Sequence, residues 1–276
     1  MAKDKQYQID GESEDSHIIH LKHQVKVNYD ENYDYYMKNP IKKFFSKIFM
    51  TFCTGLFKLI HYFSYNLKVK NKKILKNLRK QKTAFVTIAN HCLLLDSTIS
   101  IATTFPKTTY MPTVEPTMKI PVVRRILRAG NVMPIPLDMK GLVKFKKDCN
   151  EILKNGKVLH YFPEGALWPF YGKLREFKTG AFRFAVTANV PVLPYCFWFR
   201  ERKGIWKILG KNPLVTLEIL EPIYPNKELD KKTAIYDLME RAHTAMKKVI
   251  DLHPYDNPKY NEIESKLNTQ QNNTAE

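Results

Sequence analysis

Long apolar runs and cysteine pairs are both missing from this 276-residue chain. Residues 1–15 are polar and hold no apolar segment typical of a secretory signal, and the most apolar stretch, residues 48–60, is interrupted by Lys58. The four cysteines form no Cys-x-x-Cys pair, which favours reduced thiols over a disulfide framework. These absences predict an intracellular protein with neither a signal peptide nor a helix that spans a membrane.

Acidic residues are absent from residues 35–95, although the chain as a whole contains 27 of them. The same span carries 13 of the 45 lysines and arginines, and the formal charge of the whole chain is +18. A balance this basic predicts a polyanionic partner, which can be nucleic acid, an anionic membrane or a phosphorylated substrate.

Residues 41–65 interleave these cations with a dense set of apolar side chains. On a helix of about 100° per residue, most of the apolar side chains fall on one face, and Lys42, Lys43 and Lys47 fall outside it. This face predicts a helix that lies in the interface of an anionic bilayer. The alternative is an ordinary helix that buries its apolar face in the core. The apolar face comprises Phe44, Phe45, Ile48, Phe49, Phe52, Leu56, Leu59 and Phe63.

Beyond residue 82 short apolar segments alternate with helical ones, which predicts an α/β fold with a mostly parallel sheet flanked by helices. Strands are expected at 84–89, 132–137, 158–162, 191–197 and 214–220, and helices at 93–104, 142–153 and 234–252. Four parts follow from this pattern: a polar N-terminal extension (1–38), a basic amphipathic membrane-associating helical segment (39–82), an α/β domain (83–253) and a disordered tail (254–276).

Within the N-terminal extension, His17, His20 and His23 recur every three residues, beside a short strand expected at 19–22. No cysteine or carboxylate completes a ligand set at a useful spacing, so solvated histidines are favoured over a metal site.

Two motifs, each directly after an expected strand, carry the candidate chemistry. The first is Asn90-His91-Cys92-Leu93-Leu94-Leu95-Asp96. If His91 lies in a loop and Asp96 in the first turns of the next helix, Asp96 can accept a hydrogen bond from one imidazole nitrogen and make the other a general base. The alternative is a loop histidine and an aspartate that only cap the helix.

The second motif is Phe162-Pro163-Glu164-Gly165, which lies 73 positions after the first when His91 is compared with Glu164. The flanking proline and glycine favour a fixed turn that exposes the Glu164 carboxylate at the end of a strand. Ligands gather at the carboxyl ends of strands in open α/β sheets.

Together and in this order, the motifs resemble those of the glycerolipid acyltransferase family, which includes the 1-acylglycerol-3-phosphate (lysophosphatidic acid) acyltransferases. Two further blocks of that family match at residues 130–136 and 190–194, and residues 177–181 resemble the segment that leads into the last block. The resemblance covers roughly residues 40–225 and identifies residues 83–253 as an acyltransferase domain.

The resemblance implies direct acyl transfer. His91, oriented by Asp96, would take a proton from an acceptor hydroxyl, which would attack the thioester of acyl-CoA or acyl carrier protein without forming an acyl-enzyme. Backbone N–H groups near the start of the next helix would stabilise the oxyanion. No metal or other cofactor is implied. The residues that would position the acceptor are Phe162, Pro163, Glu164 and Gly165.

The implied partners are an anionic membrane surface, the thioester donor and a lipid acceptor, for which 1-acylglycerol-3-phosphate is the first candidate. The implied location is peripheral or monotopic on the cytoplasmic face of a membrane.

Two arginines that the family associates with the acceptor's phosphate are missing. Pro134-Ile135-Pro136 stands where the second block usually ends in arginine, and Glu164-Gly165-Ala166-Leu167 replaces the usual Glu-Gly-Thr-Arg. Bidentate arginine is well suited to phosphate, so either other cations replace these two or the acceptor carries no simple phosphomonoester. The replacement candidates are Arg175 and Lys178, together with Arg124, Arg125, Lys140 and Lys173.

Three alternatives stay open at this point. Cys92 beside His91 offers a thiol nucleophile with a histidine base, although Cys92 also begins an apolar run. A nucleic-acid-binding protein would explain the charge, but the chain has no zinc pattern, RNA-recognition motif or helix-turn-helix signal, so no nucleic-acid partner is expected. A catalytically inactive lipid-binding relative is the third, and intact His91, Asp96 and Glu164 argue against it.

Overall fold

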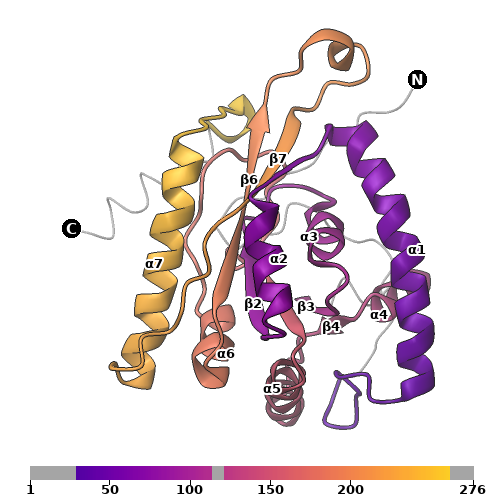
Figure 1. The fold of residues 1–276 in the computed structure, drawn as a ribbon, viewed down its shortest axis with the longest axis vertical. Coiled ribbons are helices and arrows are strands. Elements are labelled where there is room, and N and C mark those ends of the chain that lie inside the picture. Colours follow the sequence, from indigo (N-terminus) through magenta and orange to yellow (C-terminus); the bar gives the residue numbers. More distant parts are fainter. Residues whose placement is uncertain (1–28, 114–120, 262–276) are drawn as a thin grey trace.

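A seven-stranded sheet with helices on both faces forms the body of the molecule in the computed structural model, which describes residues 29–113 and 121–261 (Figure 1). The strand order is β1-β7-β6-β2-β5-β3-β4, and every neighbouring pair is parallel except β6 and β7. The prediction of a mostly parallel α/β sheet is therefore confirmed. The strands are β1 (Lys68–Lys70), β2 (Phe85–Ala89), β3 (Thr109–Thr113), β4 (Val132–Pro134), β5 (Val158–Tyr161), β6 (Val192–Arg200) and β7 (Leu214–Ile219).

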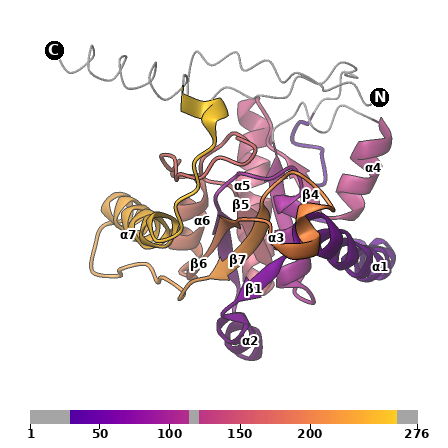
Figure 2. The same cartoon turned by 90° about the horizontal axis from the view of Figure 1, so that it is seen from above.

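The helices form a layer on each face of the sheet, and α1 lies at the outside, beside α3 and α4 (Figure 2). One layer consists of α5, α6 and α7, and the other contains α2 and α3. The helices are α1 (Pro40–Tyr65), α2 (Lys72–Lys80), α3 (Asp96–Thr104), α4 (Pro121–Ala129), α5 (Met139–Lys154), α6 (Gly180–Ala188) and α7 (Lys231–Asp251), with short 3-10 turns η2 (Gly204–Lys207) and η3 (Pro258–Tyr260).

Strand β2 lies at the centre of the sheet and is buried along its whole length. Its side chains alternate between the two layers, because Val86 and Ile88 pack with α5–α7 whereas Phe85 and Ala89 pack with α2 and α3. In the parallel β2–β5 pair, Ile88 is the register partner of Tyr161. The loops that follow the two strands therefore leave the sheet side by side, at its carboxyl edge.

The sequence predicted the central elements better than the peripheral ones. Expected strands correspond to β2, β4, β5, β6 and β7, and expected helices to α3, α5 and α7. The short elements β1, β3, α2, α4 and α6 were not singled out. The strand expected at 19–22 and the three histidines around it lie outside the described residues.

Helix α1 turns its apolar face away from the body of the protein. The side toward the body carries the buried residues Ser46, Met50, Thr54, His61 and Tyr65. Ser46 Oγ donates a hydrogen bond to the Ala129 carbonyl at 2.8 Å, and His61 Nε2 lies 2.9 Å from Thr98 Oγ1. Seven of the eight apolar residues predicted to share one face are exposed by 45–71%, and Phe49 is half-buried. A helix that buries its apolar face in the core is therefore contradicted. Among the described helices, none is long and apolar enough to cross a bilayer.

The residues from Tyr29 to α1 pack against the core, whereas the sequence analysis assigned them to a polar N-terminal extension. Tyr29, Tyr35 and Tyr36 are all buried, although composition placed them in the polar segment 1–38. The Tyr35 hydroxyl donates to the Tyr29 carbonyl at 2.7 Å, and its ring meets Phe145 of α5 edge to face at 5.5 Å between centroids. From Tyr29 onward this segment thus belongs to the core.

The tail was predicted to be disordered from residue 254, and this is wrong for residues 254–261. Tyr260 in η3 is only 4% exposed, stacks parallel to Trp168 at 5.4 Å between centroids, and donates from its hydroxyl to the Pro169 carbonyl at 2.8 Å. Composition hid this contact because two tyrosines, Tyr255 on Phe199 and Tyr260 on Trp168, anchor a segment that is otherwise polar.

Replacing Tyr35 tests whether the segment before α1 belongs to the core. Tyr35→Ala removes a buried ring, and we expect it to lower the free energy of unfolding by about 3 kcal/mol. Tyr35→Phe removes only the hydroxyl, which donates to the Tyr29 carbonyl and, at 3.3 Å, to the Asp30 carbonyl, and should cost about 1 kcal/mol. Urea unfolding followed by circular dichroism measures both changes. Equal stability of Tyr35→Ala and the unchanged protein would show that this segment does not contribute to the fold.

Candidate active site

Asn90 fixes the start of the loop after β2. Its side-chain amide donates to the Phe197 carbonyl at 2.9 Å and accepts from the Phe197 N–H at 2.8 Å, so it pairs with β6 as a backbone group would. Asn90 is 1% exposed, and the unmade bonds of a buried amide would be costly. This clamp determines where the next residue, His91, leaves the sheet.

His91 and Asp96 meet as the first motif predicted. His91 Nδ1 lies 2.8 Å from Asp96 Oδ2, and Asp96 opens α3. The aspartate side chain is fully buried, whereas that of His91 is 21% exposed. Asp96 Oδ2 also accepts the Leu93 N–H at 3.1 Å, which holds the carboxylate in place. Because a carboxylate only accepts hydrogen bonds, Nδ1 carries the hydrogen and Nε2 keeps a lone pair.

The imidazole of His91 is held between two loops. The ring stacks on Phe162 at 4.0 Å between centroids with a 15° angle between planes. The backbone carbonyl of His91 accepts a hydrogen bond from the Trp168 N–H at 3.0 Å. Phe162 therefore supports the flat side of the ring while the ring edge keeps its solvent access. The two motifs, 73 positions apart in the chain, form one site.

Glu164 is buried, which corrects the prediction that the Pro-Glu-Gly turn exposes its carboxylate. Its residue is 4% exposed, and its Oε2 accepts the His91 N–H at 3.0 Å and an Arg175 Nη2 hydrogen at 2.9 Å. Oε1 accepts the Arg175 N–H at 3.2 Å. The carboxylate turns inward because the N–H groups of two loops converge on it, and a buried charge needs such partners. Glu164 thus positions the His91 loop directly.

Arg175 is equally buried, with its guanidinium on Glu164 and on the Ala166 carbonyl and its flat face 4.7 Å from the Trp168 ring centre. Arg175 therefore lies inside the loop that follows β5, where it pairs with Glu164. The prediction that it contacts the acceptor finds no support in this arrangement.

Lys178 lies over the turn and is exposed. Its backbone N–H donates to the Pro163 carbonyl at 2.8 Å, and its side chain passes Gly165 so closely that a Cβ there would meet Lys178 Cε and Nζ at 3.0 Å. Gly165 has φ +82°, a conformation that other residues rarely adopt. A glycine at this position lets the turn close and leaves room for the lysine beside it.

Cys92 points away from the site into the apolar layer. It is 2% exposed, and burial, followed by the nearby Asp96 charge, raises the pKa of its thiol well above the usual value. A thiol held neutral in this way is a poor nucleophile. The structure therefore argues against Cys92 as the attacking group.

His160 is a site residue that the sequence analysis missed. It lies on β5, fully buried, with Nδ1 2.8 Å from Thr87 Oγ1 and its ring edge-on to Phe162 at 4.7 Å between centroids. Burial, helped by the charge of His91, lowers its pKa to about 3 and keeps it neutral. A histidine inside an apolar strand, two residues before the Phe-Pro-Glu-Gly motif, was the available signal.

The site thus offers an oriented base with an accessible nitrogen, an aromatic support, a buried ion pair behind it and a lysine at its rim. Within the described part of the chain, no three histidines, cysteines or carboxylates gather in a way that could hold a metal ion.

Comparison with known proteins finds a family model, curated relatives and a solved structure that are similar to this chain. Residues 66–198 match the model of a family described as Acyltransferase. Two curated relatives are 1-acyl-sn-glycerol-3-phosphate acyltransferases of chloroplasts: BAT2 of Brassica napus, 32% identical over 126 residues, and LPAT1 of Arabidopsis thaliana, 31% identical over 121 residues. Each alignment covers 44% of this chain, but only 34% and 33% of the relatives, so the match spans about a third of their length.

Among solved structures, the 1-acyl-sn-glycerophosphate (LPA) acyltransferase PlsC of Thermotoga maritima is similar, with 24% sequence identity and a TM-score of 0.49 over 78% of this chain and 85% of that one. The family match, together with the curated relatives, confirms the resemblance that the motifs indicated. Residues 66–198, which contain both the His91–Asp96 pair and the Glu164 turn, form an acyltransferase-family domain.

Proposed function

We propose that this chain is an O-acyltransferase that moves a fatty acyl group from a thioester to the free hydroxyl of 1-acylglycerol-3-phosphate. The observation that carries the proposal is the 2.8 Å bond between His91 Nδ1 and the buried Asp96 carboxylate, which leaves Nε2 as a base at the edge of an acyltransferase-family domain. The names of the two curated relatives support the choice of acceptor.

The proposed reaction begins with the transfer of the acceptor's hydroxyl proton to His91 Nε2. The oxygen attacks the thioester carbonyl, the carbon–sulfur bond breaks, and the leaving thiolate takes the proton back from the imidazolium. Asp96 stabilises that imidazolium from a fully buried position, where a nearby negative charge acts more strongly than in water. The donor, acyl-CoA or acyl carrier protein, stays a prediction.

Recognition of the acceptor's phosphate is assigned to Lys178. Its side chain lies over Gly165, at the same edge of the sheet as His91, and it is exposed. The guanidinium of Arg175 is buried and contacts the Glu164 carboxylate and the Ala166 carbonyl. A single lysine binds phosphate as a point charge rather than through a bidentate fork, so it tolerates more variation in the head group.

The membrane contact of the proposed enzyme is assigned to α1 and to η2 beside it. The aromatic rings of Tyr62 and Trp206 meet at 5.6 Å, and Arg202 Nη2 donates to the Ser64 carbonyl at 3.2 Å, so the β6–β7 hairpin is joined to the end of α1. Ile205 and Ile208 on this hairpin are 66% and 86% exposed. They extend the exposed apolar surface of α1. Lysines beside these apolar groups favour anionic head groups, and we place this surface on the cytoplasmic face of a membrane.

Removing the base tests the reaction. We expect His91→Ala to reduce kcat for acyl transfer to 1-acylglycerol-3-phosphate by roughly 10²–10⁴-fold, the usual contribution of general acid–base catalysis. Asp96→Asn should reduce it by roughly 10²-fold, since an amide can donate to Nδ1 and leave the wrong tautomer. Transfer from labelled acyl-CoA, with native circular dichroism as a check on folding, measures both.

Cys92→Ala serves as the matched control, because it changes the neighbouring residue without touching the base. Its turnover should stay within about threefold of the unchanged enzyme, because a substitution that removes no transition-state contact leaves the activation free energy nearly unaltered. Near-normal turnover by His91→Ala, or a complete loss in folded Cys92→Ala, is incompatible with the proposed mechanism.

Polar substitutions on α1 test the membrane contact. Phe45 and Phe52 are 63% and 71% exposed, and each inserted phenylalanine contributes about 1.5–3 kcal/mol. Phe45→Asn with Phe52→Asn should therefore weaken binding to anionic vesicles by more than about 100-fold in a flotation assay, even at high salt.

The control is Tyr236→Asn with Leu252→Asn, which removes two exposed apolar side chains, 47% and 69% exposed, at α7 on the other side of the molecule (Figure 1). It should bind vesicles as the unchanged protein does. Equal binding by both double variants would refute the assignment of α1 to the membrane.

A further inference from the structure

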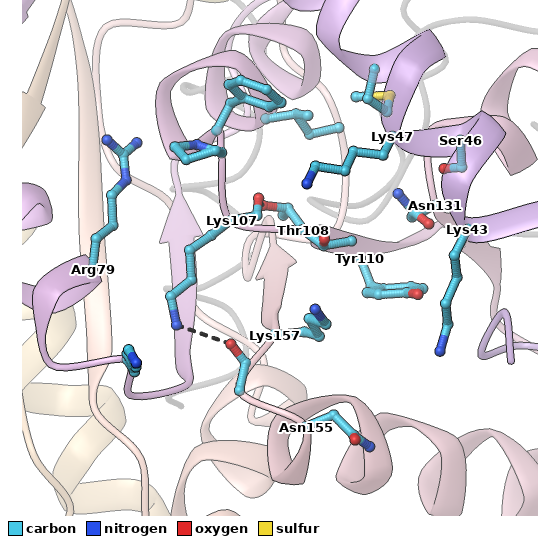
Figure 3. A pocket seen from close by; sticks show the side chains of 17 residues that line it. Lys43, Ser46, Lys47, Arg79, Lys107, Thr108, Tyr110, Asn131, Asn155 and Lys157 are labelled. Atoms are coloured by element: carbon cyan, nitrogen blue, oxygen red, sulfur yellow. Dashed lines mark hydrogen bonds between the residues drawn. The ribbon is translucent and has the colours of Figure 1, made fainter. Parts of the chain in front are cut away.

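A basic cavity lies at the end of the sheet opposite to His91. It has a volume of about 440 Å³, within the range of roughly 300–1,000 Å³ that is typical of small-ligand sites. Helix α1 forms one wall, and the residues just before β2, β3 and β5 form the other (Figure 3). Six cationic side chains line it and no acidic one does: Lys43, Lys47, Arg79, Lys82, Lys107 and Lys157.

The position of this cavity separates it from the catalytic site. Lys82 precedes β2 and Lys157 precedes β5, whereas His91 and Glu164 follow the same two strands. The five residues of β2 span roughly 16 Å at about 3.3 Å per residue. A ligand in the cavity is therefore bound at the amino edge of the sheet and does not occupy the site at its carboxyl edge.

The positive charges of the cavity are not balanced by the protein around them. Within residues 29–113 and 121–261, none of the six forms an ion pair with a carboxylate. Lys43 instead lies over the ring of Tyr36, and Lys107 Nζ donates to two backbone carbonyls, those of Thr83 at 2.6 Å and Gly156 at 2.9 Å. Like charges that share a cavity repel one another, and a bound anion would relieve that repulsion.

Arg79 and Lys107 show that the positive charge of the cavity is poorly compensated. Arg79 donates from Nη2 to the Thr103 carbonyl at 2.6 Å, but its Nε is buried and has no hydrogen-bond partner. Burial, followed by the charge of Lys157, lowers the pKa of Lys107. An unmade hydrogen bond at a buried guanidinium is unusual, and it adds to the cost of the positive charge at this place.

Lysines lie on both walls of the cavity. In Figure 3, Lys47 extends from α1 toward Thr108, on the far wall, where Lys107 and Lys157 also lie. The amide of Asn131 and the hydroxyl groups of Thr108 and Tyr110 add hydrogen-bonding groups to the lining. Several cations with neutral donors around them are the usual features of a phosphate site.

We propose that this cavity is a second anion site, which binds a phosphate group independently of catalysis. Phosphate fits because it accepts several hydrogen bonds at once and carries up to two negative charges. The group can come from a lipid head group or from free phosphate.

A neighbouring cavity of about 350 Å³ bears on the lipid source. It shares Arg79 and Phe105 with the basic cavity, and Leu75 and Ile99 are among the apolar residues that line it. A phosphate held by the lysines would thus lie next to an apolar groove that can take part of an acyl chain.

The test compares two double variants with equal loss of charge. Lys47→Gln with Lys157→Gln removes one cation from each wall and avoids Lys107, which holds backbone carbonyls. Lys146→Gln with Lys147→Gln removes two exposed lysines of α5 that do not line the cavity. The first arm titrates the full chain in neutral detergent with inorganic phosphate by calorimetry at constant ionic strength. The second measures flotation with phosphatidylcholine vesicles, with and without phosphatidic acid. No thioester donor is present, so neither arm depends on acyl transfer.

We expect the cavity variant to bind phosphate roughly tenfold more weakly than the unchanged protein, and the α5 variant to bind it equally well. If the difference appears in the first arm, the cavity takes free phosphate. If it appears only as a lost preference for phosphatidic acid in the second arm, the cavity takes a lipid head group. Equal behaviour of the two variants in both arms would overturn the proposal.

Discussion

The buried carboxylate of Glu164 joins the parts of the candidate active site, and the positions of the other groups depend on it. It accepts hydrogen bonds from the His91 N–H and from Arg175, so one charge ties the loop after β2 to the loop after β5. Parallel pairing of these two strands brings the loops together, and the ion pair then fixes them. Arg175 in turn lies over Trp168, on which Tyr260 of the tail stacks. A neutral residue in place of Glu164 would leave a buried guanidinium without its partner, which is costly.

The two sides of α1 have different roles: one side contacts the domain, and the other is the proposed membrane contact. The side toward the protein carries the buried residues Ser46, Met50, Thr54, His61 and Tyr65, and Ser46 and His61 make hydrogen bonds there. The side away from it carries the phenylalanines. This inverted amphipathicity explains why a helix this rich in apolar residues contributes little to the core. It also places Lys43 and Lys47 at the wall of the basic cavity, between the proposed bilayer surface and the sheet.

The sequence predicted the His91–Asp96 pair and the central strands because both depend on local order: a motif of fixed spacing, and apolar runs long enough to recognise. It failed where long-range contacts decide. Glu164 was expected to be exposed, since the turn alone does not reveal that Arg175, eleven residues later, returns to pair with it. Tyr260 in a polar tail and the tyrosines before α1 were missed for the same reason, because a few aromatic anchors do not change composition. His160 lacked any motif of its own. The basic cavity is assembled from five separate segments, which no window of sequence contains.

In the proposed mechanism, the acyl group passes directly from the thioester to an acceptor hydroxyl activated by His91, and no acyl-enzyme intermediate forms. In the most direct test, the protein is incubated with labelled acyl-CoA, with and without 1-acylglycerol-3-phosphate. Mass spectrometry then follows the label in the lipid and on the intact protein. Direct transfer predicts labelled lipid only when the acceptor is present, and an unmodified protein mass in both samples. A protein that gains the mass of one acyl group in the absence of acceptor, and loses it when acceptor is added, would contradict direct transfer.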